Sequence, residues 1–242
     1  MTLDDHSDLL TRRRFLSWAG AFSLSLVTLA ATAPGAVVAG ASALPVPIYH
    51  GSRATRRIAL TIDDGWGPEN VRRIFDLLQA NDVAATFLPY ARAMHLDRAL
   101  WHRIASAGFP IANHTNSHPF MTRLSARKQH FELTNARHVI EQVTGLASAP
   151  IFRPPYGNFN ATTLRVAADA GFPKVVLWDT TDLGTSGTRS TRRMTAAAQR
   201  GTNGSILLVH GGPSLTPVIL PAVIRSYRAR GFKFVTLPEL LS

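Results

Sequence analysis

Short apolar runs alternate with longer amphipathic stretches along the chain from residue 57 onward. The first apolar run, residues 58–62, is followed by Pro68, where a helix could start, and then by apolar residues at the spacing of one helical face. The same alternation predicts further strands at 84–88, 109–112, 151–152, 174–178, 206–209 and 232–236. It predicts further helices at about 98–107, 125–144, 160–171, 190–200 and 217–230. About seven such units predict an α/β protein with a parallel sheet, either open or closed into a barrel.

Five of the predicted strands run directly into polar segments. These segments lie at residues 61–65, 113–119, 152–157, 178–182 and 207–212. They contain two adjacent carboxylates, three histidines and an arginine. Because the C-terminal ends of parallel strands in an α/β barrel point to one face, we expect these side chains to converge on one opening.

Two of these histidines have the spacing of metal ligands. His114 and His118 are the only pair among the nine histidines that lie four residues apart. That spacing places both rings on one side of a helical turn, which is a frequent way to hold zinc. The alternative is a pair of loop histidines that cap backbone groups. A carboxylate from another strand end favours the metal site, because two histidines and one aspartate leave coordination open for water.

Asp63 and Asp64 need separate roles. Neighbouring residues in an extended strand point to opposite sides, so both can face one site only if the strand bends there. Gly65 is compatible with such a bend, although an ordinary Asp-Gly turn would have the same sequence.

Arg153 and His210 also follow strands. Arg153 precedes two prolines that stiffen its backbone, and a fixed guanidinium beside a carboxylate favours the ionised form. The alternative for Arg153 is a surface arginine beside a proline turn. His210 follows an apolar run and precedes two glycines, which also fits a buried histidine with satisfied hydrogen bonds.

The N-terminal segment is typical of an export signal. Residues 11–16 read Thr-Arg-Arg-Arg-Phe-Leu, a mildly apolar run extends to about residue 38, and residues 41–43 form a small-x-small cleavage pattern. The paired arginines resemble the twin-arginine signal that exports folded proteins. Residues 1–43 are therefore predicted to be a twin-arginine-type signal peptide. An uncleaved anchor is the alternative, but Pro34 and several polar residues interrupt the run, so we expect no stable transmembrane anchor.

The amino-acid composition excludes several kinds of catalytic and metal site. The 242-residue chain has no cysteine, which excludes disulfides, thiolate metal sites and thiol nucleophiles. Any metal must therefore be held by histidine and carboxylate. The formal net charge of +11 fits contact with an anionic cell envelope. The chain contains no recognisable signature of nucleic-acid binding, so nucleic acid is not an expected partner.

With these motifs in order, the sequence resembles the polysaccharide deacetylases, the NodB-homology group that is also called carbohydrate esterase family four. The similarity covers about residues 55–241 and includes the intervening residues 77–87. The resemblance implies a distorted (β/α) barrel of about seven parallel strands. It also implies that residues 44–242 form a single catalytic domain.

The resemblance assigns roles to individual residues. It implies that Asp63 is the general base and that Asp64, His114 and His118 hold a divalent metal, with zinc favoured. Arg153 would orient Asp63, and the backbone N–H of Tyr156 would help to hold the oxyanion. Tyr156 would also contact substrate, as would Trp178. Leu208 would line the pocket for the acetyl methyl group, and His210 would be the general acid.

The fourth motif departs from the family pattern D-x-x-D-W. Asp179 and Asp182 keep the spacing, but Leu183 stands where the tryptophan would be. Aligning Trp178 with an upstream tryptophan of the family would instead place Thr181 at the first aspartate position. Either aspartate is thus a candidate to support His210.

The resemblance implies an exported hydrolase that releases acetate from an N-acetylated sugar polymer, such as peptidoglycan or a chitin oligomer. Such an enzyme would be secreted, periplasmic or bound to the cell wall. The alternatives are an O-acetyl esterase on xylan, a hydrolase of another small amide, and an inactive carbohydrate-binding relative.

Overall fold

The computed structural model describes residues 44–184, 187–212 and 214–242, which belong to one compact unit. The predicted signal peptide, residues 1–43, lies outside the described residues. The strands are β1 (Arg57–Asp64), β2 (Thr86–Pro89), β3 (Ala112–Asn113), β4 (Ala149–Phe152), β5 (Lys174–Val175), β6 (Thr180–Thr181), β7 (Ser205–His210) and β8 (Lys233–Val235). The α-helices are α1 (Pro68–Ala80), α2 (Ala91–Met94), α3 (Arg98–Ser106), α4 (Ala126–Thr144), α5 (Ala161–Asp169), α6 (Thr191–Ala198), α7 (Thr216–Ala229) and α8 (Leu237–Leu240).

The strands form two parallel sheets. One has the order β2-β1-β7-β6, with β8 paired to the start of β1, and the other has the order β3-β4-β5. A parallel bridge between Phe87 and Ile111 joins the sheets on one side, while the segment 48–50 forms bridges to Val176 and Ser205 on the other. The predicted α/β fold with parallel strands in a single domain is confirmed. The ring of strands is that of a distorted barrel.

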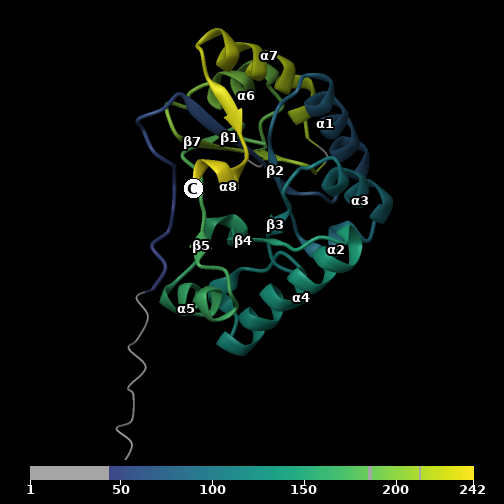
Figure 1. The fold of residues 1–242 in the computed structure, drawn as a ribbon, viewed down its shortest axis with the longest axis vertical. Coiled ribbons are helices and arrows are strands. Elements are labelled where there is room, and N and C mark those ends of the chain that lie inside the picture. Colours follow the sequence, from purple (N-terminus) through teal and green to yellow (C-terminus); the bar gives the residue numbers. More distant parts are fainter. Residues whose placement is uncertain (1–43, 185–186, 213) are drawn as a thin grey trace, which may run out of the picture. The chain divides into compact units, whose positions relative to one another are not determined.

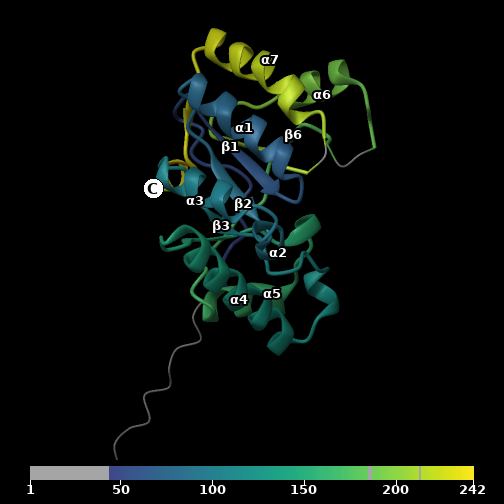
Figure 2. The same ribbon diagram turned by 90° about the vertical axis from the view of Figure 1, so that its right-hand side faces the viewer.

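The helices lie outside the strands. In both ribbon views α1, α6 and α7 lie beside the β1–β7 sheet, whereas α4 and α5 lie beside the smaller sheet (Figures 1 and 2). No helix in the described part of the chain is long and apolar enough to cross a membrane.

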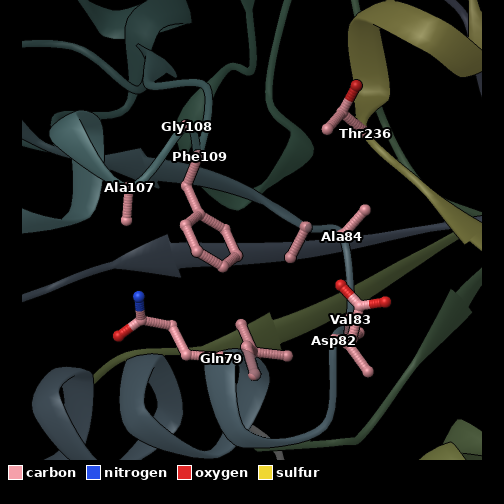
Figure 3. A pocket seen from close by; sticks show the side chains of 10 residues that line it. Gln79, Asp82, Val83, Ala84, Ala107, Gly108, Phe109 and Thr236 are labelled. Atoms are coloured by element: carbon pink, nitrogen blue, oxygen red, sulfur yellow. The ribbon is translucent and has the colours of Figure 1, made fainter.

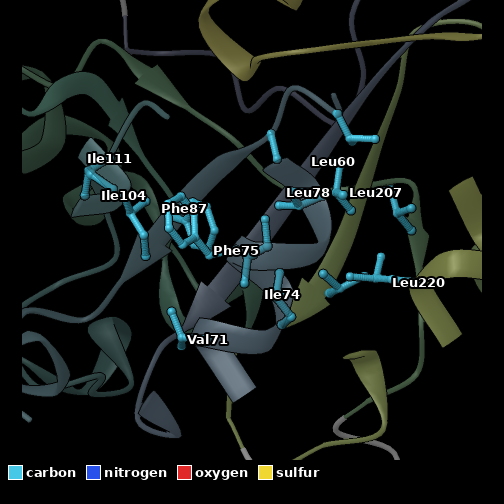
Figure 4. Close-up of a cluster of buried hydrophobic side chains, with 14 of the residues drawn as sticks. Leu60, Val71, Ile74, Phe75, Leu78, Phe87, Ile104, Ile111, Leu207 and Leu220 are labelled. Atoms are coloured by element: carbon cyan, nitrogen blue, oxygen red, sulfur yellow. The ribbon is translucent and has the colours of Figure 1, made fainter. Parts of the chain in front are cut away.

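The main core lies between the outer face of the larger sheet and its helices. Four side chains on one face of α1, Val71, Ile74, Phe75 and Leu78, are buried against Leu60 and Leu207 of the sheet (Figure 4). Burying each such side chain stabilises the fold by roughly 1.5–3 kcal/mol.

The alternation of side chains along β1 and β7 positions the site. In β1, Ile58, Leu60 and Ile62 belong to this outer core, so Thr61 and Asp63 point to the inside of the barrel. In β7, the same alternation turns Leu208 and His210 inward. Asp63 and His210 are register partners on adjacent strands, which brings their side chains to the same level.

The predicted elements agree with the structure, with local differences. Ser125 and Asn160 cap α4 and α5 through their side chains, and Gly145 ends α4 with a φ of 72°. The predicted strand 174–178 is shorter in the structure: β5 ends at Val175, and Val176 forms an isolated bridge to Ile48. The short elements α2, β6 and α8 were not predicted, since two to four residues carry too little periodicity.

Candidate metal and catalytic site

The predicted site residues, with the exception of Asp179, converge at the carboxyl ends of β1 and β7. A cavity of about 320 Å³ lies there and is lined by Asp63, Asp64, His114, His118, Tyr156, Trp178, Leu208 and His210. Arg153 and Asp182 lie directly behind this lining, in contact with Asp63 and His210 respectively. Residues from five separate polar segments therefore meet in one cavity, as the position of those segments after strands predicted.

Asp63 is held by a buried arginine. The Arg153 guanidinium donates through Nη1 to Asp63 Oδ1 at 2.6 Å and to Thr61 Oγ1 at 2.9 Å, and through Nη2 to the Leu177 carbonyl oxygen at 3.0 Å. Both charged side chains are almost fully buried. Such a buried, paired charge fixes the direction of the carboxylate, since any other position would leave a charge without a partner.

The backbone bends at Asp64. Its φ is 73°, a value that residues other than glycine seldom adopt, and Gly65 follows with a φ of 85°. This bend turns the Asp64 carboxylate into the same cavity as that of Asp63, which a regular strand would not allow. A Cβ atom at position 65 would lie 2.6 Å from the Trp101 ring, so only glycine fits there. The bend expected at this position is thus present.

Asp64, His114 and His118 form a compact cluster. Asp64 Oδ1 lies 3.2 Å from His118 Nε2 and 3.6 Å from His114 Nε2, and one ligand atom from each residue lies within 4.8 Å of the others. Burial acts to raise the pKa of Asp64, but the hydrogen bonds of the two histidines, with the charges of His114 and His210, outweigh it and lower that pKa far below its usual value. Asp64 is therefore a carboxylate at any physiological pH.

The two histidines lie on a loop and not on a helical turn, which corrects the prediction drawn from their spacing. The chain from 114 to 120 forms no helix, and Thr115 and His118 have φ values of 70° and 60°. These left-handed residues, rather than a helical repeat, turn both rings toward Asp64. Thr115 Oγ1 accepts a hydrogen bond from the His118 backbone N–H at 3.0 Å and stabilises that turn.

Glu132 anchors the histidine loop from α4, and sequence reasoning did not identify it. Its buried carboxylate accepts hydrogen bonds from the backbone N–H groups of Asn116 and Ser117 at 2.9 and 2.8 Å, and from Ser117 Oγ at 2.7 Å. The only sequence signal was one of the two acidic residues of an amphipathic helix. Such residues are usually exposed, so the pattern alone did not mark it.

The cluster has the chemistry of a metal site. His114 Nδ1 lies 2.8 Å from the Arg153 carbonyl oxygen and must donate its proton there, because a carbonyl oxygen can only accept. In the neutral imidazole, which is the form that binds metals, the lone pair of Nε2 is then on the side of Asp64, where it can bind a cation. Two imidazole nitrogens and one carboxylate oxygen suit a divalent metal and leave further coordination positions open. These three residues can therefore hold such an ion.

Asp182, and not Asp179, lies beside His210. Asp182 Oδ1 lies 3.5 Å from His210 Nδ1, and the buried Asp182 side chain also accepts hydrogen bonds from the Gly184 N–H and Thr216 Oγ1, each at 2.7 Å. Burial acts to lower the pKa of His210, but Asp182 and then the charges of Asp63 and Asp64 raise it above its ordinary value.

Asp179 has a different environment. Its carboxylate accepts hydrogen bonds from Arg53 Nη2, Ser205 Oγ and the Ile206 N–H at 2.7–3.0 Å, at the start of β7. The structure thus separates the two candidate aspartates, and the one at the second position of the motif is the neighbour of His210.

Three further predicted residues complete the lining. Tyr156 has a φ of 60° and its ring lies edge-on to His118, with 4.6 Å between ring centroids. Leu208 contributes a buried apolar wall, and Trp178 is partly buried against Gly157. The cavity therefore combines the polar groups with an apolar surface large enough for a methyl group.

A separate cavity of about 340 Å³ lies between the C-terminal ends of α1 and α3 and the start of α8 (Figure 3). Phe109 projects into it, and its described lining has one acidic side chain, that of Asp82, and no histidine or basic residue. Because catalytic sites need convergent polar groups, this cavity does not compete with the one described above.

Comparison with known proteins agrees with this geometry. The family model described as polysaccharide deacetylase matches residues 50–175, which is more than half of the chain. The chain is 28% identical over 202 residues to the peptidoglycan-N-acetylglucosamine deacetylase PgdA of Listeria monocytogenes, covering 82% of this chain and 42% of PgdA. It is 29% identical over 208 residues to a chitooligosaccharide deacetylase of Bradyrhizobium, covering 79% of this chain and 94% of that protein.

Among solved structures, the chain superposes with a TM-score of 0.76 on BA3943, described as a CE4 family pseudoenzyme from Bacillus anthracis. The identity is 28%, with 82% of this chain and 69% of the other covered. The chain spans less than half the length of PgdA, so the match concerns one part of that relative. The extent of the family match, together with this fold, shows that the chain belongs to the polysaccharide deacetylase family.

Proposed function

We propose that this protein is an exported, metal-dependent hydrolase that removes acetyl groups from the N-acetylated sugars of a cell-wall glycan. The observation that carries the proposal is that three groups meet at one cavity. They are the buried carboxylate of Asp63, the cation cluster formed by Asp64, His114 and His118, and His210 with Asp182 behind it. Two relatives with deacetylase names, PgdA and the Bradyrhizobium protein, support the choice of an N-acetylated glycan.

Asp64, His114 and His118 would hold the metal, and their ligand types favour zinc. A bound divalent cation would supply Lewis-acid chemistry at this position, polarising the acetyl carbonyl and lowering the pKa of water. The protein residues around the cluster would perform the proton transfers.

Asp63 is suited to be the general base. Arg153 and Thr61 hold it in one orientation, and its free oxygen, Oδ2, faces the cation cluster, 3.8 Å from His114 Nε2. It would take a proton from the water that attacks the acetyl carbon. The negative charge that develops on the carbonyl oxygen would be stabilised by the backbone N–H of Tyr156.

His210 is suited to be the general acid. With Asp182 behind Nδ1, the imidazole is favoured in its protonated form, and Nε2 is left to donate a proton to the departing sugar amine. Breaking the C–N bond then yields acetate and a free amino sugar. Leu208 and Trp178 would enclose the methyl group of the acetyl unit.

The test is acetate release from purified protein that has been stripped of metal and then restored with zinc. N-acetylglucosamine oligomers, isolated peptidoglycan and acetylated xylan would be compared in parallel. Zinc-dependent acetate from either N-acetylated polymer supports the proposal, and Asp63→Asn should abolish that release while zinc remains bound. Acetate from xylan alone would assign an O-acetyl esterase instead.

A second candidate function is glycan binding without catalysis, and the likeness to BA3943, which is described as a pseudoenzyme, is the observation that favours it. The presence of Asp63, the cation cluster and His210 in one cavity argues for activity. Zinc-loaded protein that binds glycan yet releases no acetate from any of the three polymers would decide for the non-catalytic function.

Export is the remaining part of the proposal. It rests on the twin-arginine motif and the small-x-small pattern of residues 11–43, and it places the protein outside the cytoplasm. Fractionation of cells that express the full chain tests it. Replacing the two arginines Arg12 and Arg13 by lysine should keep the protein inside the cell.

A further inference from the structure

A second, larger cavity opens beside the catalytic one. Its volume is about 620 Å³, and its lining includes Asp64, His118 and Tyr156, which also line the smaller cavity. The two cavities are therefore neighbours that share a wall at the cation cluster. Its volume is within the range of about 300–1,000 Å³ that is typical of ligand pockets.

Trp66 forms one wall of this second cavity and is not explained by packing alone. It directly follows the Asp63-Asp64-Gly65 segment, and 49% of its surface is exposed. Its indole lies on the backbone of Gly212, where a Cβ atom would be only 2.6 Å from Nε1. Because Gly212 has no Cβ atom, the indole can lie against its backbone while it lines the cavity.

A second aromatic residue, Tyr156, also lines the cavity. Tyr156 is 56% exposed, and its ring stacks on that of Phe120 at 4.0 Å between centroids with an angle of 13°. Exposed apolar groups gathered around a polar cavity mark a binding surface. Flat aromatic faces beside polar groups suit the pyranose ring of a sugar, whose C–H groups gather on one face.

Arg92 adds positive charge to the same cavity. Its exposed side chain comes from α2, and among the described residues it forms no ion pair. Its backbone N–H donates to the Asn116 carbonyl oxygen at 3.0 Å, which ties α2 to the histidine loop. The acidic residue of the lining, Asp64, is already engaged with the two histidines. Arg92 is therefore free to pair with an anionic ligand.

We propose that this second cavity is a subsite for the sugar next to the one that is deacetylated, and that it selects a sugar carrying a carboxylate. Trp66 would stack on the pyranose and Arg92 would pair with the carboxylate. This chemistry fits a glycan in which N-acetylglucosamine alternates with N-acetylmuramic acid whose lactyl carboxylate is free, as in peptidoglycan strands without stem peptides, over an uncharged chitin oligomer. The inference rests on the proposed function and names the substrate class of that site.

The test measures binding to metal-stripped protein, so that no turnover takes place. Isothermal titration would compare two tetrasaccharides of equal length: neutral N-acetylglucosamine tetramer, and alternating N-acetylglucosamine and N-acetylmuramic acid without stem peptides. The wild-type protein should prefer the acidic ligand. Arg92→Gln should reduce that preference by about five-fold, the effect of one exposed ion pair, whereas Arg92→Lys should keep most of it.

Trp66 would contact the sugar through the face of its uncharged indole ring, so its replacement should affect the neutral and the acidic ligand alike. Trp66→Ala should weaken both tetrasaccharides by about ten-fold, and Trp66→Phe should retain most of the affinity. The matched controls lie on α4, where Arg127 and Phe131 are exposed outside both cavities. Arg127→Gln and Phe131→Ala should change neither affinity, and circular dichroism would establish that each variant is folded.

Equal affinity of the wild-type protein for the two ligands, or an unchanged preference in Arg92→Gln, would overturn the selection for a carboxylate. Unchanged affinities in folded Trp66→Ala would overturn the subsite. Binding that follows the expected pattern in a protein that releases no acetate would uphold the subsite and reject the catalytic function. Acetate release without these binding differences would uphold the catalytic function and reject the subsite.

Discussion

Glu132 tests how the site is organised, because it lines neither cavity and is not one of the proposed metal ligands. Its carboxylate accepts three hydrogen bonds from the loop between His114 and His118. We predict that Glu132→Ala lowers the affinity for zinc while leaving the three ligands in place.

The magnitude follows from these contacts. Removing the carboxylate leaves two backbone N–H groups without their charged acceptor, and each lost bond of this kind costs about 1.5–3 kcal/mol. Part of that cost is recovered when water enters. Loss of residues that orient metal ligands typically lowers metal affinity by about 10- to 100-fold. That range corresponds to about 1.4–2.8 kcal/mol, the size of one such bond.

Glu132→Gln is the milder variant. Its amide oxygen can still accept from the two backbone N–H groups, and its NH₂ group can donate to the Ser117 hydroxyl. Only the charge is lost, so the fall in zinc affinity should be smaller than for alanine. Glu141→Gln, an exposed change on the same helix, is the matched control.

The assay is competition for zinc against a chromophoric chelator, followed by acetate release at rising zinc concentration. Excess zinc should restore most of the activity of Glu132→Ala, since the ligands and the catalytic groups remain. The reasoning is wrong if both Glu132 variants bind zinc within about two-fold of wild type. It is also wrong if activity stays lost in a fully zinc-loaded variant.

Three further predictions concern the buried charges. Asp182 favours the protonated form of His210 and so raises the pKa of that histidine. Asp182→Asn should therefore move the alkaline limb of the kcat–pH profile to lower pH. The control variant Asp179→Asn should lower only thermal stability. His210→Ala should reduce turnover by at least about 100-fold with zinc still bound, as measured by acetate release and metal analysis; near-normal turnover would exclude it as the general acid. Arg153→Met should destabilise the fold by about 3–5 kcal/mol in urea titrations, because it leaves the Asp63 charge buried without a partner, and Asp63→Asn in the same chain should recover part of this loss.

The sequence predicted the elements, and the meeting of the polar segments at one end of the strands, because both depend on local features. The helix face of α1 repeats every three to four residues, and the caps of α4 and α5 are single residues next to the helices that they end. Likewise, a polar residue after a buried strand faces the carboxyl end of the barrel wherever the other strands lie. Asp63, Asp64 and His210 could therefore be assigned to one opening before their distances were known.

The tertiary structure decided what depends on contacts between distant segments. Asp179 and Asp182 are equivalent by spacing, and only the packing of β6 against β7 and α7 brings Asp182 to His210. The histidine pair suggested a helical turn, whereas left-handed residues and Glu132, which comes from the next helix, shape the loop.

The second cavity shows the same division. Trp66 follows a recognisable motif, but nothing near it in sequence indicates that Arg92 and Tyr156 line the same space. The local free energy of a few neighbouring residues sets strands, caps and bends, and this can be read along the chain. Which charges become paired and which aromatic rings stay exposed depends on the sum of long-range contacts, and these exist only once the barrel has closed.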